Sequence, residues 1–245
     1  LYNQAKNKPY GGGLIVDQIF PNISDQLRKN VEHVIRDGIS QDQTTQQIVR
    51  RIKGTKAQDY NDGLLAASRK DITTEVITAR NHVTAISYAD TWKALGFEYV
   101  IDLATLDGRT SKYCSSIDHR VQKLDENTKR PPYHRRCRTV QVGTDKDGNL
   151  DSVRPFVASD KPVSKIPKDQ RQGIIGQVDA NTTYPQWFAK QDASFQKSWL
   201  GASRYKLYKE GKYPISKFVD PLNGKLFTLA ELKKMDEQTF TQLKL

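Results

Sequence analysis

Residues 98–143 read EYVIDLATLDGRTSKYCSSIDHRVQKLDENTKRPPYHRRCRTVQVG. Residues 99–105 are rich in β-forming side chains and alternate roughly between apolar and polar, which predicts a strand. Two further short strands are predicted over 120–124 and 138–142. The turn signal Asp147-Gly148-Asn149 then closes the segment. The stretch therefore predicts a small antiparallel β module over residues 98–143.

Both cysteines of the chain lie in this module, and each is close to a histidine. Cys114 and His119 are separated by four residues, His134 and Cys137 by two, and the loop between the pairs is 14 residues long. Two sulfur and two nitrogen ligands in short-spaced pairs suit a tetrahedral structural zinc site. A polar module with little core would also gain stability from a metal cross-link. We expect zinc at Cys114, His119, His134 and Cys137, with Asp118 as the alternative to His119.

Two other states of the cysteines stay open. One is a Cys114–Cys137 disulfide, formed after release from a reducing cell, and the other is a pair of reduced thiols packed in the module. Two cysteines are too few for a disulfide framework.

Catalysis by this cluster is not expected. Asp118-His119 resembles the start of a His-metal nuclease motif, but no histidine follows His134 to complete that motif. A Cys/His nucleophile would need an activating base and an oxyanion donor, and nothing in the sequence places either. We therefore expect no enzymatic activity, and a metal-dependent enzyme stays the least favoured function.

Three residues of the first loop look structural. Asp107-Gly108 bends the chain, and Arg109 can pair with Asp107 or Asp118 to fix the loop. We expect Asp107, Arg109 and Thr110 to shape this loop rather than bind a substrate.

Positive charge is concentrated in the same module. Residues 99–143 carry nine Lys/Arg against five Asp/Glu, within a net charge of +11 for the chain. Such an excess favours a polyanion, either nucleic acid or an acidic protein surface, although a solvated basic face would also keep the protein soluble. With Tyr133 as the one aromatic residue nearby, we expect sequence-independent contact with double-stranded DNA rather than base stacking. The expected contact residues are Lys129, Arg130, Arg135, Arg136 and Arg138.

A helical lead is predicted over residues 1–97, after a flexible stretch that ends at Gly11-Gly12-Gly13. One helix should begin at Ser24 and close at Gly38, and a second should run from Ser40 to Gly54. The strongest signal is a long amphipathic helix from about Leu64 to Leu95. Its expected apolar stripe consists of Ile72, Val76, Ala79, Val83 and Ile86. His82 lies off this stripe and is expected to be a partly exposed polar residue.

The remaining chain divides in two. Residues 144–181 contain three prolines and little apolar periodicity, which indicates an extended linker or arm. Residues 182–245 should form a C-terminal helical segment, with capping boxes beginning at Thr183 and Thr228 and a short hairpin near Phe218 and Gly224. The fold class expected for the whole chain is α+β.

Composition excludes some classes of protein. Hydrophobic residues make up 36% of the 245 residues, and no stretch approaches the roughly 18 consecutive apolar residues of a membrane helix. Residues 1–20 do not read as a signal peptide, because their apolar run is too short. We expect a small core and no membrane segment.

The motif order resembles a known family. Ala104-Thr-Leu-Asp-Gly-Arg-Thr-Ser111, then Cys114, Asp118 and Arg130-Pro-Pro-Tyr-His-Arg-Arg-Cys-Arg138, is similar to the signature of phage Mu F-like head-morphogenesis proteins. The helical segment that begins at Gly38 and the segment that begins at Thr183 are similar to the family as well. The resemblance covers about residues 38–143 and 182–232. In some members a cysteine stands where this chain has Ser111, and the residue after Asp118 is usually small.

The resemblance implies a function. Members of this family are minor head proteins of tailed bacteriophages, so we expect a low-copy virion component that binds the portal or the major capsid protein during head morphogenesis. It would act in the host cytoplasm during assembly and then remain inside the head. An alternative is a DNA-binding module that is ejected with the genome.

Overall fold

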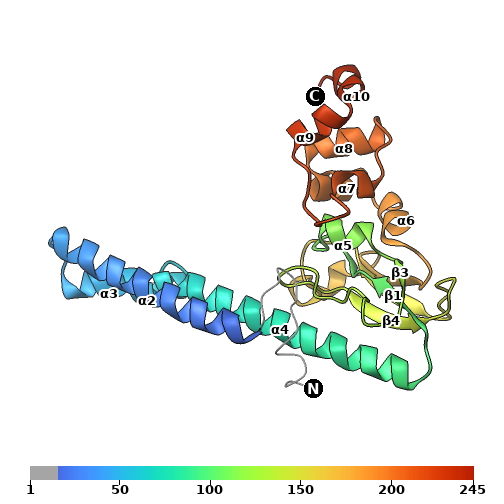
Figure 1. The fold of residues 1–245 in the computed structure, drawn as a ribbon. Coiled ribbons are helices and arrows are strands. Elements are labelled where there is room, and N and C mark those ends of the chain that lie inside the picture. The colour runs from blue at the N-terminus through green and yellow to red at the C-terminus, as the bar shows by residue number, and fades with distance from the viewer. Residues whose placement is uncertain (1–15) are drawn as a thin grey trace. The chain divides into compact units, whose positions relative to one another are not determined.

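The computed structural model describes residues 16–245, except the side chains of 16–24, 67, 68, 72 and 75. The stretch predicted to be a flexible lead-in, ending at Gly13, lies outside the described residues. The chain forms two compact units, one of residues up to 87 with 130–137 and one of 88–129 with 138–245. The described residues form helices and small sheets (Figure 1), which confirms the α+β class.

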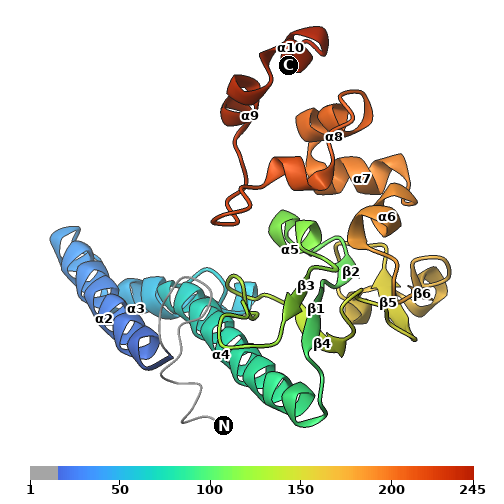
Figure 2. The same ribbon diagram turned by 45° about the vertical axis from the view of Figure 1, so that its right-hand side comes forward.

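The first unit is helical. Its elements are α2 (Val16–Ser40), α3 (Thr45–Lys53), η1 (Lys56–Gln58) and most of α4 (Leu64–Ala94). The helix predicted to begin at Ser24 begins at Val16, and the one predicted to begin at Ser40 begins at Thr45. The second difference has a local cause, because the Thr44 and Gln47 side chains form a complete capping box. Helix α3 lies beside α2 (Figures 1 and 2).

Helix α4 confirms the predicted long helix, but its buried face is turned relative to the predicted stripe and shares Ile86 with it. Thr74, Thr78, His82, Ile86 and Ala89 are buried, whereas Val76 is 50% exposed. The prediction that His82 is partly exposed is therefore wrong, as is the place of Val76 on the buried stripe. Hydroxyl groups can be buried here because the Thr74 and Thr78 side chains donate to carbonyl oxygens one turn earlier, each at 2.7 Å.

A three-stranded antiparallel sheet confirms the β module. Its strands are β1 (Tyr99–Leu103), β3 (Val121–Lys123) and β4 (Val140–Thr144), in the order β3-β1-β4. Ile101 of β1 lies opposite Val121 on one side and Val142 on the other. Both faces of β1 are covered, because Val100, Ile101 and Asp102 are all buried.

A second sheet occupies the segment that was expected to be an extended arm. It consists of β2 (Leu106–Asp107), β5 (Val153–Val157) and β6 (Ile175–Asp179), with β5 in the middle (Figure 2). Strand β5 pairs in parallel with β2 and antiparallel with β6. The sequence pattern does not predict β5, because the most buried residue of this strand is the charged Arg154 rather than an apolar one. The intervening loop contains η2 (Val163–Lys165) and η3 (Lys168–Gln170).

The main hydrophobic core lies in the C-terminal helices. These are α6 (Tyr184–Ala189), α7 (Ala193–Leu200), α8 (Ala202–Lys209), η4 (Ile215–Phe218), α9 (Leu229–Met235) and α10 (Glu237–Gln242). Both predicted capping boxes, at Thr183 and Thr228, are present. The expected hairpin near Phe218 is a single bridge between Val219 and Leu226. Within the described part of the chain, no helix combines the length and apolar character needed to cross a membrane.

Aromatic side chains dominate this core. Its largest buried members are Tyr184, Trp187, Phe188 and Phe218, which are joined by Leu106 from β2. The Tyr184 hydroxyl donates to the carbonyl oxygen of Asp107 at 2.9 Å. This hydrogen bond connects the loop of Asp107, Arg109 and Thr110 to the core.

Candidate metal centre

Cys114 is positioned by a short helix that the sequence did not reveal. Helix α5 (Lys112–Ser116) begins after Ser111, whose hydroxyl accepts the N–H of Cys114 at 3.1 Å. This N-cap satisfies a backbone group that the helix itself leaves unpaired. The Cys114 side chain is buried, with 3% of its surface exposed.

The other two cluster members lie on a tight turn. The N–H of Cys137 donates to the carbonyl oxygen of His134 at 3.0 Å, and Arg136 adopts a positive φ of 58° between them. Helix α4 holds this turn through side chains spaced along one face. Three hydrogen bonds are made, from Arg136 N–H to Thr78 Oγ1 (3.0 Å), from Arg136 Nε to Thr74 Oγ1 (2.7 Å) and from Asn81 Nδ2 to the Cys137 carbonyl (2.8 Å).

Cys114, His134 and Cys137 come together. Each offers one ligand atom, and these atoms all lie within 4.8 Å of one another. The two thiols are buried and the histidine is partly exposed. His134 Nδ1 lies 2.8 Å from the carbonyl oxygen of Arg135, so Nδ1 carries the proton and Nε2 carries the lone pair that a metal needs. This group could therefore hold a metal ion.

His119 and Asp118, the other expected ligands, lie outside the cluster. The His119 ring is 3.0 Å from Asp118 Oδ2 through Nδ1 and 2.9 Å from the Ala180 carbonyl oxygen through Nε2. Both nitrogens are thus engaged in hydrogen bonds away from the thiols. Among the described residues, the cluster contains three of the four predicted ligands.

Asp118 is the centre of a buried polar network instead. Its side chain is fully buried and pairs with Arg154 at 3.0 Å, and it also accepts the backbone N–H groups of Ala104 (2.7 Å) and Tyr184 (2.6 Å). Burial by itself raises the pKa of Asp118, but hydrogen bonds from His119 and Arg154 outweigh burial and leave the pKa below its ordinary value. A carboxylate with these partners is a structural group.

Asp107 forms a similar centre. Its fully buried carboxylate accepts from Arg138 at 2.6 and 2.7 Å and from the Arg109 side chain at 2.9 Å. Thr110 Oγ1 donates to the carbonyl oxygen of Thr105 and also contacts Asp107. The structure thus places Asp107, Arg109 and Thr110 together in one loop and pairs Arg109 with Asp107 rather than Asp118.

A third buried carboxylate was not singled out from the sequence. Asp102 in β1 accepts from Arg120 at 2.8 Å, from Gln122 at 3.0 Å and from Gln141 at 3.0 Å. The sequence feature that could have identified Asp102 is its place inside a strand that is otherwise apolar. Arg154 had no comparable signal, because its partner Asp118 is 36 residues away.

The basic run predicted to contact DNA has mixed roles. Arg138 is paired with Asp107, and Arg136 is bonded to Thr74 and Thr78. Arg135 is 55% exposed and lies 3.5 Å from the equally exposed Asp71. The structure therefore uses at least Arg136 and Arg138 to hold its own chain, while Lys129 is exposed and Arg130 is half-buried.

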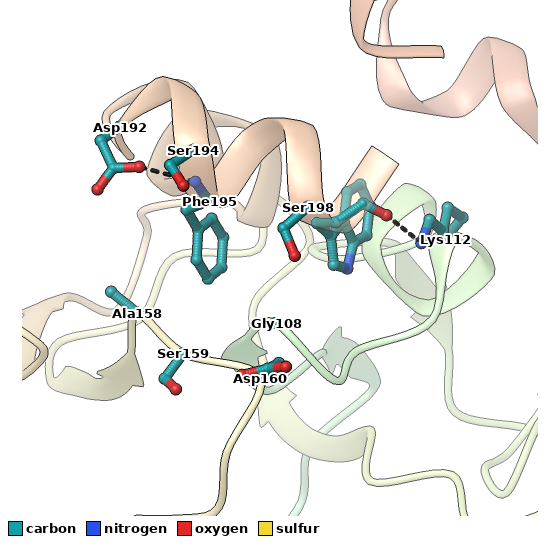
Figure 3. A pocket seen from close by; sticks show the side chains of 10 residues that line it. Gly108, Lys112, Ala158, Ser159, Asp160, Asp192, Ser194, Phe195 and Ser198 are labelled. Carbon is teal, nitrogen blue, oxygen red and sulfur yellow. Dashed lines mark hydrogen bonds between the residues drawn. The ribbon is translucent and has the colours of Figure 1, made fainter. Parts of the chain in front are cut away.

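A cavity of about 480 Å³ is a second candidate site (Figure 3). One face of α7 lines it with Ser194, Phe195, Ser198 and Trp199, across from the loop 158–160. Lys112 Nζ donates to the Trp199 carbonyl oxygen at 2.6 Å and lies 4.3 Å from the centre of the Trp199 ring.

The chemistry of this cavity is mixed. Burial, together with the charge of Arg204, lowers the pKa of Lys112 to about 8. Asp160 and Asp192 bring the opposite charge to the same cavity. A charged ligand would therefore meet one cationic and two acidic side chains.

Comparison with known proteins identifies no relative. No family model matches the chain, and neither a curated protein nor a solved structure does.

Proposed function

We propose that this chain is a minor head protein of a tailed bacteriophage, with a structural role in head morphogenesis near the portal and the capsid. The observation that carries the proposal is the order of Asp107, Cys114, Asp118, His134 and Cys137, which resembles the signature of the Mu F-like family. The protein would act in the host cytoplasm during assembly and remain in the virion head.

The roles of these residues in the fold support a structural protein over an enzyme. Asp107 and Asp118 are fully buried and paired with arginines, so neither is offered to a substrate. Cys114, His134 and Cys137 gather in one group. A motif whose members stabilise the chain itself suits an assembly protein, and we propose no catalytic role.

The metal that best suits this cluster is zinc. Thiolate and imidazole ligands favour zinc over the harder cations, and structural zinc sites are usually four-coordinate. We propose that Cys114 Sγ, His134 Nε2 and Cys137 Sγ bind the ion and that a water or another group completes the tetrahedron. Zinc would then stabilise the fold without taking part in chemistry.

Chemical cross-linking of purified phage particles from cells that carry this gene tests the assembly role. We expect exposed lysines such as Lys29 and Lys190 to cross-link to peptides of the portal or the major capsid protein, as identified by mass spectrometry. Particles that lack the chain, or cross-links to host proteins alone, would contradict the proposal.

Contact with packaged double-stranded DNA is a secondary proposal, and its expected contact residues include the exposed Lys129 and Arg135 and the half-buried Arg130. The commitment of Arg138 to Asp107 weakens it, because a neutralised guanidinium adds little to phosphate binding.

A further inference from the structure

Helix α3 is a well-formed helix that buries none of its residues. Its N-terminus is closed by the Thr44–Gln47 capping box, and its C-terminus by the N–H of Gly54 donating to the Arg50 carbonyl oxygen at 2.7 Å. A helix of this length is marginal in water without a surface to pack against. The face of α3 that does not contact α2 is therefore a candidate surface for a partner.

One face of α3 is used against α2. Ile48 packs over Gly38 so closely that a Cβ at position 38 would lie 2.6 Å from Ile48 Cγ1. Arg51 Nη2 donates to Asp37 Oδ2 at 2.6 Å, which neutralises this arginine. The contacts of α3 with the rest of the first unit thus involve one side of the helix.

The opposite face lines a shallow pocket of about 370 Å³. Val49, which is 50% exposed, contributes an apolar surface. Arg50, Lys53 and Lys56 line the same pocket, and none of its eight lining residues is acidic. The pocket is therefore cationic and has an apolar contribution from Val49.

Hydrogen bonds from Thr55, and to a lesser extent the charge of Arg50, lower the pKa of Asp62, so this carboxylate partly offsets the charge of Arg50. Asp62 is held by Thr55, whose N–H and hydroxyl donate to it at 2.7 and 2.8 Å. Lys53 Nζ lies 5.2 Å from the centre of the Tyr60 ring, and no ion pair is made by Arg50 or Lys56 within the described residues. Among the described residues, Lys53 and Lys56 thus offer positive charge to a partner, together with an Arg50 that Asp62 partly offsets.

We infer that this face of α3 binds an acidic, amphipathic segment of a partner protein. Carboxylates would pair with Arg50, Lys53 and Lys56, and an apolar side chain would cover Val49. A nucleic-acid backbone would satisfy the charges but leave Val49 exposed, so the observations favour a peptide. The inference rests on the proposed assembly role for the biological partner, but its test does not need that partner.

The test is fluorescence anisotropy of a labelled synthetic helical peptide, with glutamates on one face and leucines on the other, titrated with the full chain. Lys53→Gln should weaken binding about two- to five-fold at low salt, the size expected for one exposed ion pair. Val49→Ser should also weaken binding, with an unchanged salt dependence. Both side chains are exposed, and circular dichroism checks that the helices persist.

Matched controls come from α2. Lys29→Gln removes an exposed lysine, and Ile39→Ser removes an apolar side chain that is 65% exposed; neither should change the affinity. Equal losses in Lys29→Gln and Lys53→Gln would overturn the inference, as would a peptide that does not bind. Duplex DNA binding that depends on Lys53 but not on Val49 would show a phosphate-binding face instead. Peptide binding by a chain that is absent from phage particles would contradict the assembly role alone.

Discussion

Arg154 holds the carboxylate of Asp118 with both of its terminal nitrogens, at 3.0 Å from Nη1 to Oδ2 and 3.1 Å from Nη2 to Oδ1. Both side chains are buried, with 7% and 0% of their surfaces exposed. Arg154 lies on β5, and Asp118 also accepts the first N–H of α6, so the pair connects the second sheet to the C-terminal core.

Replacing Arg154 by methionine should destabilise the protein strongly. The substitution keeps much of the side-chain volume but leaves the Asp118 carboxylate buried without its cation. Breaking one side of a buried pair costs about 3–5 kcal/mol. Urea unfolding followed by circular dichroism measures this loss of free energy. The double variant Arg154→Met with Asp118→Asn should lose less than the sum of the two single variants, and strict additivity would show that the two residues are not coupled.

Acid should destabilise the folded chain partly through Asp118. Burial raises the pKa of this carboxyl, but the hydrogen bonds from His119 and Arg154 prevail, so the folded pKa is below the ordinary 3.8. Its contribution to stability is therefore fully present above pH 3.8 and is lost as the pH falls through the lower, folded pKa. Unfolding free energies measured across this range should fall less steeply for Asp118→Asn than for the unmodified chain. Parallel curves would contradict this role.

Replacing Arg138 should lower the free energy of unfolding more than replacing Arg135. Arg138→Ala deprives the buried Asp107 of its two shortest side-chain contacts and should cost about 2–3 kcal/mol of unfolding free energy. Arg135→Ala removes an exposed side chain and should change stability by no more than about 0.5 kcal/mol. Thermal or urea unfolding of both variants checks the contrast. A similar loss in both would contradict the assignment of Arg138 as the structural residue.

The protein purified without added reductant should contain about one zinc ion per chain. His134→Gln and Cys137→Ser should lose the metal, because each removes one of three ligands. His119→Gln should keep it, because that ring is bonded to Asp118 and Ala180. Elemental analysis measures the zinc content, and a thiol titration measures the number of reactive cysteines. Metal-free protein with two reactive thiols would refute the zinc site, and protein with neither metal nor free thiols would indicate the Cys114–Cys137 disulfide.

Gly63 should tolerate no side chain. A Cβ at this position would lie 2.2 Å from the backbone nitrogen of Gly54, so the connection between α3 and α4 would have to shift. We expect Gly63→Ala to cost about 2–3 kcal/mol, as overpacking does. Gly96→Ala is the comparison, because nothing lies within 4 Å of its Cβ position and only its φ of +83° opposes the change, at about 1 kcal/mol. Hydrogen exchange in α3 and α4 would report the difference, and equal effects would contradict the steric explanation.

Local patterns predicted much of the secondary structure. The capping boxes at Thr183 and Thr228 and the long helix α4 are where the sequence places them. These signals depend on residues three or four positions apart, so they can be read without knowledge of tertiary contacts. The strands of the first sheet were predicted for a similar reason, because alternation is visible within a few residues.

The candidate site was only partly predictable. Residue type and spacing led to Cys114, His134 and Cys137, since thiols and imidazoles in short-spaced pairs are uncommon in other roles. The same logic selected His119, whose ring is turned toward Asp118 and the Ala180 carbonyl. Spacing cannot show which way a side chain points or which distant carbonyl it meets.

Sequence patterns were enough to predict the long helix α4, the helices that begin at the Thr183 and Thr228 capping boxes, the β module and the residue types that could bind a metal. Which polar and charged side chains are buried depends on contacts between residues that are distant in the chain. Arg154 lies inside the second sheet, and Thr74, Thr78 and His82 form the buried face of α4, against the hydrophobic pattern of both segments. A polar group can be buried at low cost only when a partner satisfies it. For Arg154, that partner lies 36 residues away in the chain.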